Sequence, residues 1–295
     1  MAEKREANEV FSSPAEEHIK KSKQFKTSPH EEQQAQNTRI GDDFDFEIPI
    51  EIVPLPSEGK VYALGTTLCN KTELEISSLT AREEDILTSE ALIKQGTMIE
   101  HLLKSCITDK TVNVNSMLLG DRLALLIAIR ATGYGAEYSV EATCPACKQK
   151  FKATFNLATL PIKHLTIEPI EEFSNKFSFM LPVIKKNVIF KFLNGNDERE
   201  LALAIERKKN VSAIGSSVTT RLIYQIEAIG NVSDKGKIAQ IVRKLPALDS
   251  LKLRTYIDDN EPGIDTTSHA QCNSCGWYGE VDVPLGAEFF WPSGK

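Results

Sequence analysis

The sequence predicts an α+β protein that contains a zinc ribbon built from two distant halves, with a helical insertion between them. Two C-x-x-C pairs, Cys144 with Cys147 and Cys272 with Cys275, each interrupt a stretch of alternating apolar and polar residues. Such alternation is typical of β-strands, so each pair lies in the turn of a predicted hairpin. Apolar residues at helical spacing precede the first pair and recur between the pairs. Blocks of helices and small antiparallel sheets indicate the α+β class.

The composition is ordinary for a globular protein, and it argues against nucleic acid as the main partner. The chain has 295 residues, of which 41% are hydrophobic and 26% are charged, and its net charge is −6. A phosphate-binding protein usually carries a basic face, so a pI near 5.6 disfavours proteins that coat DNA or RNA.

No targeting segment or membrane span is expected. The sequence contains no run of about 18 apolar residues, the length that a membrane span needs. Its first stretch, MAEKREANEVFSSPAEEHIKKSKQ, is charged and lacks the apolar segment of a signal peptide. We therefore expect the protein in the cytoplasm, where cysteines remain thiols.

Composition and patterning divide the chain into regions. Residues 1–45 are rich in Gln, Glu, Lys and Ser, which predicts a disordered polar tail. The other expected regions are an extended arm plus an α/β unit over 46–135, the ribbon halves over 136–160 and 266–295, and a hairpin and helical insertion over 161–265.

The arm and the α/β unit come first. In FEIPIEIVPLPSEGKVY, alternation followed by prolines and a glycine predicts an extended arm, a turn and a short strand, and a second strand is predicted at Glu73–Ile76. Thr80 with Glu83, and Thr97 with Glu100, each match the capping box that begins a helix. The next helix, DRLALLIAIRAT, is apolar nearly all round and is therefore predicted to be buried.

Hairpins and helices make up the rest. YSVEATC and KFKATFNL are predicted strands beside the first cysteine pair, HAQC and WYGEVDV flank the second, and residues 177–192 form a predicted hairpin. Apolar residues at helical spacing predict four further helices. These are marked by Leu201, Ala204 and Ile205; by Leu222, Ile223, Ile226 and Ile229; by Ile238, Ile241, Val242 and Leu245; and by Leu248–Ile257.

The cysteine spacing predicts a structural Zn²⁺ site. Zinc binds four thiolates in a tetrahedron, and a C-x-x-C turn in a hairpin presents two sulfurs at a suitable separation. A closed shell of four thiolates leaves no position for water or substrate. The predicted ligands are Cys144, Cys147, Cys272 and Cys275.

Zinc at this site would close a loop of more than a hundred residues. Metal binding of about 10 kcal/mol or more can offset the chain entropy of that closure. We therefore expect loss of the metal to destabilise the insertion together with the ribbon. Gly276 suits the left-handed turn that points backbone amides at the sulfurs, and Lys148 takes the same place after the first pair.

Two other interpretations of the cysteines stay open. A disulfide within each pair would indicate a redox enzyme, but thioredoxin-type motifs begin a helix, whereas these pairs lie in predicted hairpins. The pairs could also be unconnected thiols. Cys69 and Cys106 are expected to be small apolar residues, and we assign them no role.

The sequence shows no arrangement typical of an enzyme. It contains no phosphate-binding loop, no dinucleotide-binding glycine motif after a strand, no HExxH and no GxSxG. Its five histidines are scattered along the chain. We therefore expect neither catalysis nor a small-molecule substrate.

Several strings occur in a characteristic order between about residues 48 and 293. They are VPLPSEGKVY, LTAREEDIL, LLKSCI, LLGDRLALLIAIRATGYGAEY, CPAC, PALDSLKLRTYI, CGWYGEVDVPLG and FFWP. Together they resemble the baseplate hub proteins of contractile-tailed, T-even-type bacteriophages. The resemblance implies a structural or assembly protein of the hub, located in the host cytoplasm during assembly and in the virion tail baseplate. Its implied partners are other baseplate or hub proteins and the tape-measure protein.

Two apolar segments are candidates for contact with such partners. PIEIVPLPSEGK is suited to add a strand to the edge of a neighbour's sheet. The large side chains of EFFWP could anchor in a partner, or they could pack back on the chain's own ribbon. The candidate residues are Ile50, Ile52, Leu55, Phe289, Phe290 and Trp291.

The alternative function is a zinc ribbon that binds nucleic acid in a transcription or replication complex. Lys148, Lys150 and Lys152 supply positive charge near the first pair, whereas Glu280 and Asp282 oppose it near the second. Salt-sensitive DNA binding would distinguish this function, because phosphate contacts release counterions.

Overall fold

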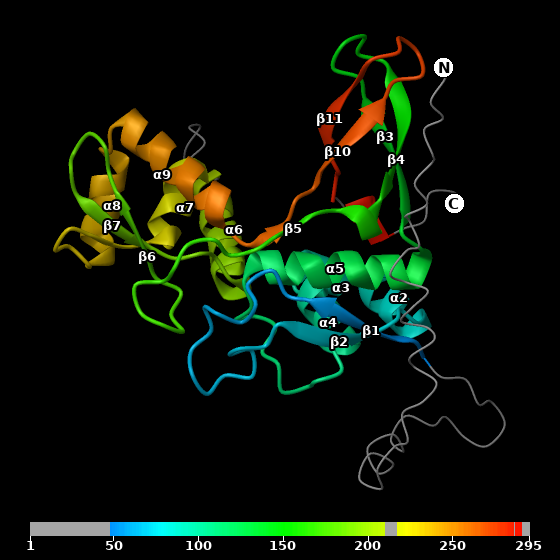
Figure 1. The fold of residues 1–295 in the computed structure, drawn as a ribbon, viewed down its shortest axis with the longest axis horizontal. Coiled ribbons are helices and arrows are strands. Elements are labelled where there is room, and N and C mark those ends of the chain that lie inside the picture. The colour runs from blue at the N-terminus through cyan, green and yellow to red at the C-terminus, as the bar shows by residue number, and fades with distance from the viewer. Residues whose placement is uncertain (1–47, 210–216, 286, 291–295) are drawn as a thin grey trace, which may run out of the picture. The chain divides into compact units, whose positions relative to one another are not determined.

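Helices alternate with small antiparallel sheets along the chain, so the predicted α+β class is confirmed (Figure 1). The computed structural model describes residues 48–209, 217–285 and 287–290. The predicted polar tail over residues 1–45 and the candidate anchor Trp291 lie outside these ranges. Within the described part of the chain, no helix combines the length and the apolar character that a membrane span requires.

The first elements are a two-stranded sheet and four helices. They are β1 (Ile50–Pro54), β2 (Glu73–Ser77), α2 (Ala81–Thr88), α3 (Glu90–Gln95), α4 (Met98–Cys106) and α5 (Leu119–Tyr134). Strands β1 and β2 are antiparallel, and Val53 lies opposite Leu74 on the buried face of the sheet. The predicted arm and second strand therefore pair with each other.

The helix starts differ from one another in a way that the sequence pattern did not reveal. The Thr80 N–H donates to the Glu83 carboxylate at 3.0 Å, as the first predicted capping box requires. The second predicted box is wrong. Thr97 has no side-chain capping bond, because its φ of −107° and ψ of 0° are not the extended values of a normal cap. Glu100 instead accepts a hydrogen bond from Lys104 at 2.6 Å.

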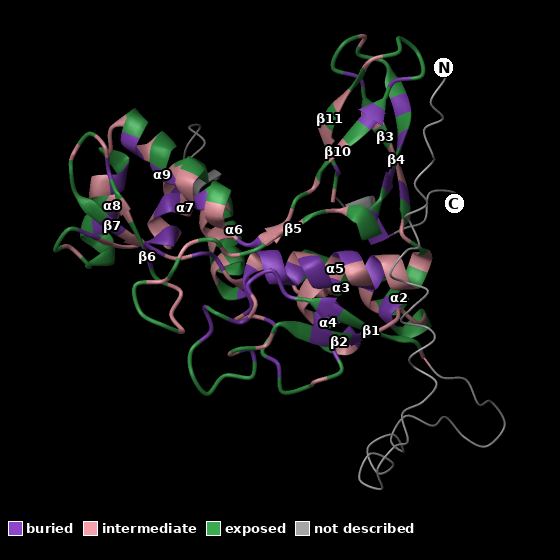
Figure 2. Ribbon diagram, viewed as in Figure 1, coloured by how far each residue is buried: buried purple, intermediate pink, exposed green. Residues whose placement is uncertain are grey.

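Helix α5 is predominantly buried, as its apolar sequence predicts (Figure 2). Asp121 in its first turn is fully buried and accepts hydrogen bonds from the Ser57 N–H at 2.9 Å, the Ser57 hydroxyl at 2.6 Å and the Tyr62 hydroxyl at 2.5 Å. Burial raises the pKa of Asp121, and the hydrogen bonds from Ser57 and Tyr62 oppose that rise. These bonds fix the PLPSEGKVY segment to the start of α5.

Two hairpins have the strand, C-x-x-C, strand order predicted for the ribbon halves, and a short 3-10 helix that was not predicted follows each of them. The elements are β3 (Glu137–Thr143), β4 (Lys150–Asn156), η2 (Leu157–Thr159), β10 (Thr267–Gln271), β11 (Tyr278–Asp282) and η3 (Ala287–Phe290). Each hairpin is an antiparallel pair, and β4 contacts β10, so the hairpins lie side by side (Figure 1).

The segment between the hairpins holds a three-stranded sheet and four helices. Its elements are β5 (Ile162–Lys163), β6 (Phe177–Met180), β7 (Asn187–Phe190), α6 (Gly195–Lys209), α7 (Ser217–Gln225), β8 (Ile226–Ile229), α8 (Lys235–Arg243), α9 (Ala247–Asn260) and β9 (Gly263–Ile264). The predicted hairpin is present, with Phe177 opposite Phe190 and Phe179 opposite Val188.

One element of this segment was predicted wrongly. Ile226 and Ile229 belong to strand β8 and not to the helix that their spacing suggests, because the chain leaves α7 at Gln225 and pairs with β7. In that pairing Ile226 lies opposite Phe190 and Ile229 opposite Val188. β-Branched residues suit a paired strand, and tertiary pairing outweighs local spacing.

The two ends of the segment meet each other. Strands β5 and β9 pair antiparallel, with Ile162 opposite Ile264. Helix α5 packs against β9 so closely that a Cβ atom on Gly120 would lie 1.8 Å from the carbonyl oxygen of Pro262. The start and the end of the insertion are therefore held together beside α5.

Candidate metal centre

The four cysteines of the C-x-x-C pairs come together at the ends of the two hairpins. Their ligand atoms all lie within 4.8 Å of one another. The Sγ atoms of Cys144 and Cys275 are 3.7 Å apart, and those of Cys147 and Cys272 are 3.8 Å apart. Each hairpin thus contributes one sulfur to each of these two pairs.

The two cysteine turns have the same backbone geometry. The Cys144 N–H donates to the Gln149 carbonyl at 2.9 Å, and the Lys148 N–H donates to the Cys144 carbonyl at 3.0 Å. The second turn repeats both bonds, from Cys272 to Trp277 at 2.8 Å and from Gly276 to Cys272 at 2.9 Å.

The residue after each pair adopts the left-handed conformation expected from the sequence. Lys148 has a φ of +62° and Gly276 a φ of +74°. Glycine takes this conformation freely, whereas lysine is strained by its Cβ atom. The first turn therefore accepts a conformational cost that the second avoids.

The distances between the sulfurs fit a tetrahedral zinc site. A Zn–S bond of about 2.3 Å gives tetrahedral edges of about 3.8 Å. A disulfide would instead bring two sulfurs to about 2.05 Å. All four cysteines are free thiols, two of them buried and the others partly or fully exposed. The donor set thus suits a closed shell of thiolates better than two disulfides.

Four sulfurs at this distance cannot all carry charge without a cation. Burial opposes ionisation of Cys272, but the backbone N–H groups of Cys275 and Ser274 outweigh it and lower the Cys272 pKa to about 7. The Trp277 N–H favours the Cys275 thiolate, but the neighbouring sulfur of Cys147 disfavours a second negative charge, and the Cys275 pKa is raised to about 12. A divalent cation removes this conflict, because it compensates several thiolates at once.

The candidate partner-binding residues of the arm divide into two groups. Ile50 and Ile52 lie on the outer face of the β1–β2 sheet, where their side chains are 62% and 56% exposed. Leu55 is fully buried and belongs to the core. Only the first two side chains are thus positioned to meet another protein in this conformation.

Phe289 and Phe290 pack on the chain itself. Phe289 and Phe290 are buried, and the Phe289 ring lies edge-on to Tyr138 with 5.3 Å between ring centroids. The Arg130 Nε–H donates to the Phe289 carbonyl at 2.9 Å. Sequence reasoning missed Arg130, although a charged residue inside an apolar helix was a visible signal. For Phe289 and Phe290, the structure shows the packing alternative.

Comparison with known proteins identifies the family but gives no individual relative. No curated protein and no solved structure matches the chain. Residues 50–291 match the family described as T4 bacteriophage base plate protein, and this range includes every predicted zinc ligand. Because the match covers most of the sequence, the chain belongs to the T4 bacteriophage base plate protein family.

Proposed function

We propose that the protein is a structural or assembly component of the baseplate hub, which acts through protein–protein contacts and contains one structural Zn²⁺. The family match over residues 50–291 carries this proposal. The narrower assignment to the hub draws on the order of the strings noted in the sequence. Its partners are then other baseplate or hub proteins and the tape-measure protein, met in the host cytoplasm during assembly and in the tail baseplate.

The proposed zinc is supported by the donor set and by its surroundings. Four cysteine sulfurs lie within 4.8 Å of one another, and two equivalent turns present them. Cys144, Cys147, Cys272 and Cys275 would hold the ion, which would contribute structure and not chemistry, since four thiolates complete its shell. The metal would join two hairpins that are far apart in the sequence.

The β1 edge is the best-supported partner surface. Strand β2 is covered on its far side, where the Thr108 N–H donates to the Glu75 carbonyl at 3.0 Å. Strand β1 pairs only with β2 among the described residues, so its other edge presents backbone groups that a neighbour's strand can pair. Ile50 and Ile52, which are exposed, would pack against side chains of that added strand.

The charge on the ribbon supports protein partners over nucleic acid. Lys150 is paired with Glu141 at 2.9 Å, and Glu280 and Asp282 lie on β11. A phosphate-binding ribbon needs a basic face, and these acidic residues reduce the positive charge of this one.

Co-purification during infection tests the proposal. Chains tagged at either end are expressed during infection by the phage that encodes them, and the bound proteins are identified by mass spectrometry. We expect hub, spike or tape-measure proteins. Recovery of polymerase subunits or nuclease-sensitive material would contradict the hub role and favour the nucleic-acid alternative.

Two variants locate the contact. Ile52→Lys should reduce recovery of the partner, because it places a charge on the outer face of the sheet. Leu64→Lys is the matched control, since Leu64 is 72% exposed but lies outside the sheet. Native mass spectrometry of the purified chain should show one zinc ion, and Cys272→Ser should lose it.

A further inference from the structure

Two adjoining cavities lie beside helix α7, away from the cysteine cluster. The first has a volume of about 380 Å³ and lies between α6, α7 and α9. The second has a volume of about 320 Å³ and is lined by the start of α5 and by residues around β9. Arg221 and Asp258 line both cavities, so the two adjoin and form one groove.

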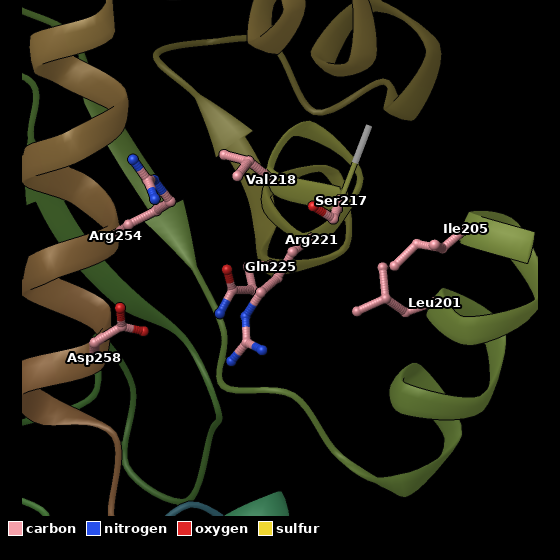
Figure 3. Close-up of a pocket in the computed structure, with 8 residues that line it drawn as sticks. All are labelled: Leu201, Ile205, Ser217, Val218, Arg221, Gln225, Arg254 and Asp258. Carbon is pink, nitrogen blue, oxygen red and sulfur yellow. The ribbon is translucent and has the colours of Figure 1, made fainter. Parts of the chain in front are cut away.

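One wall of the first cavity is apolar. Leu201 and Ile205 extend toward it from α6, whereas Val218, at the start of α7, lies on the side of Arg254 (Figure 3). Val218 is 44% exposed, so the cavity is open to solvent at that end. The wall can accept an apolar side chain from another molecule.

The opposite wall carries donors that lack strong acceptors. Gln225 is 2% exposed, and its Nε2 has no hydrogen-bond partner among the described residues. Figure 3 shows the Gln225 amide beside Arg221, on the side of α7 that faces α9. This amide nitrogen is sealed from solvent, so it is an unpaired donor beneath the lining of the cavity and not a contact for a ligand.

Both arginines of the groove are also weakly paired. The Arg221 Nη2 atom lies 3.6 Å from the Glu261 carboxylate, which is longer than a charge-assisted hydrogen bond. Arg254 donates its Nε–H to the Ser250 carbonyl at 3.3 Å, and within the described ranges its guanidinium forms no ion pair. Asp258 is the acidic residue of the first cavity. That cavity therefore holds two guanidinium groups and one carboxylate.

We propose that this groove binds an extended acidic segment of a partner protein. Side-chain carboxylates of that segment pair with Arg221 and with Arg254, and a neighbouring apolar side chain packs on Leu201 and Ile205. Two adjoining cavities suit several residues of peptide better than one small anion. Asp258 and Glu261 offset part of the positive charge of Arg221, Arg254 and Lys163 in the groove, so a singly charged carboxylate suits it better than a doubly charged phosphate group. The inference deepens the proposed function and rests on it for the identity of the partner as another baseplate protein.

Binding to a peptide array tests the groove. The probe is the full-length purified chain, applied to overlapping peptides that cover the other tail and baseplate proteins of the same phage. A matched array carries Asn for Asp and Gln for Glu. We expect bound peptides to contain an acidic residue next to an apolar one, and to lose binding on the amide array. An array without bound peptides, or binding equal on both arrays, would overturn the proposal.

Two variants on α9 move the affinity in opposite directions, which simple misfolding cannot do. Arg254→Gln should raise the Kd of a bound peptide about tenfold, since a charged hydrogen-bond donor is lost. Asp258→Asn should lower the Kd about threefold, since it removes a partly screened repulsion. Lys252→Gln, on the exposed face of the same helix, is the control and should leave the Kd unchanged.

The outcomes separate this inference from the hub role. If inorganic phosphate or duplex DNA displaces the peptides at equal ionic strength, the occupant is a phosphate group and the proposal fails. If the hub proteins co-purify but neither α9 variant changes peptide binding, the hub role stands and the groove proposal is wrong. If the peptides bind as expected but only unrelated proteins co-purify, the groove stands and the hub role is wrong.

Discussion

The ribbon and the region around α5 join distant parts of the chain by different means. In the ribbon, the first hairpin buries Phe151, Ala153 and Phe155 on β4 and Tyr138 on β3, whereas the strands of the second hairpin bury only Ala270. The second hairpin therefore adds little to the core, and the four sulfurs are its concentrated link to the first. Around α5, by contrast, many buried side chains and the hydrogen bonds of Asp121 together hold distant parts of the chain in place. Loss of one cysteine ligand should therefore release the two hairpins from each other. Loss of one side chain around α5 should remove only part of the free energy that stabilises that core.

The largest effect is expected from Cys272→Ser. It removes one of four ligands, and structural zinc binding supplies about 10 kcal/mol or more. The ribbon should lose its amide protection in hydrogen exchange. The insertion should keep its protection, because the β5–β9 pair and the contact with α5 close it independently.

This expectation replaces the one drawn from loop closure in the sequence, in which loss of the metal destabilises the insertion together with the ribbon. Cys69→Ser is the matched control, as Cys69 is a partly buried thiol outside the cluster. If the insertion loses protection along with the ribbon, then the metal closes the whole loop and the β5–β9 pair does not suffice.

The next largest effect is expected from Asp121→Ala. The change leaves the buried Ser57 and Tyr62 hydroxyls and the Ser57 N–H without their acceptor, at a cost of about 3 kcal/mol in the free energy of unfolding. Urea denaturation measures the loss. Asp85→Ala, at an exposed position on α2, should change the free energy by less than about 0.5 kcal/mol. Equal effects of the two variants would show that Asp121 does not organise the core.

The two cysteine turns permit a smaller and more local test. Gly276→Ala should destabilise the ribbon by about 1 kcal/mol, because alanine is strained at a φ of +74°. Steric clash cannot explain such a loss, since a Cβ atom there meets nothing within 4 Å. Lys148→Gly should stabilise the first turn by up to about 1 kcal/mol for the same reason. Thermal unfolding of zinc-loaded chains measures both, and changes of the same sign would refute the backbone explanation.

The smallest effect is expected from Asp109→Asn. Lys71 donates to the Asp109 carboxylate at 2.7 Å and, together with Thr111, lowers the Asp109 pKa to about 2. A lowered pKa stabilises the fold above the unfolded-state pKa of about 4, and this contribution is lost as the pH falls toward 2. Because solvent still reaches and screens this partly exposed pair, the difference at neutral pH should be below about 1 kcal/mol. Denaturation between pH 7 and 2 should show the variant and the native chain converging. A difference that grows at low pH would exclude this ion pair as its cause.

The cysteine cluster could be predicted from the sequence because each half of it is encoded by residues that are close together in the chain. Spacing within each C-x-x-C pair fixes the turn, and Gly276 marks the left-handed residue directly. The meeting of the two pairs followed from zinc chemistry, since one pair offers only half of a tetrahedral shell.

Features that depend on distant partners could not be predicted in this way. Ile226 and Ile229 have helical spacing, and only their pairing with β7 makes them a strand. Phe289 could serve a core or an interface, and its packing against Tyr138, far away in sequence, is visible only in the folded chain. The groove beside α7 has no local signal, because separate helices supply its lining.

The pairing of β5 with β9 also bears on how such a chain could change over evolutionary time. Paired residues in an antiparallel sheet lie about 5 Å apart, a gap that a turn of about two residues can span. Ile162 and Ile264 are such a pair, so the gene could gain, lose or exchange the segment between them without separating the cysteine hairpins. The segment between β5 and β9 can thus be exchanged as a unit, so partner specificity could diverge there while the metal centre stays the same.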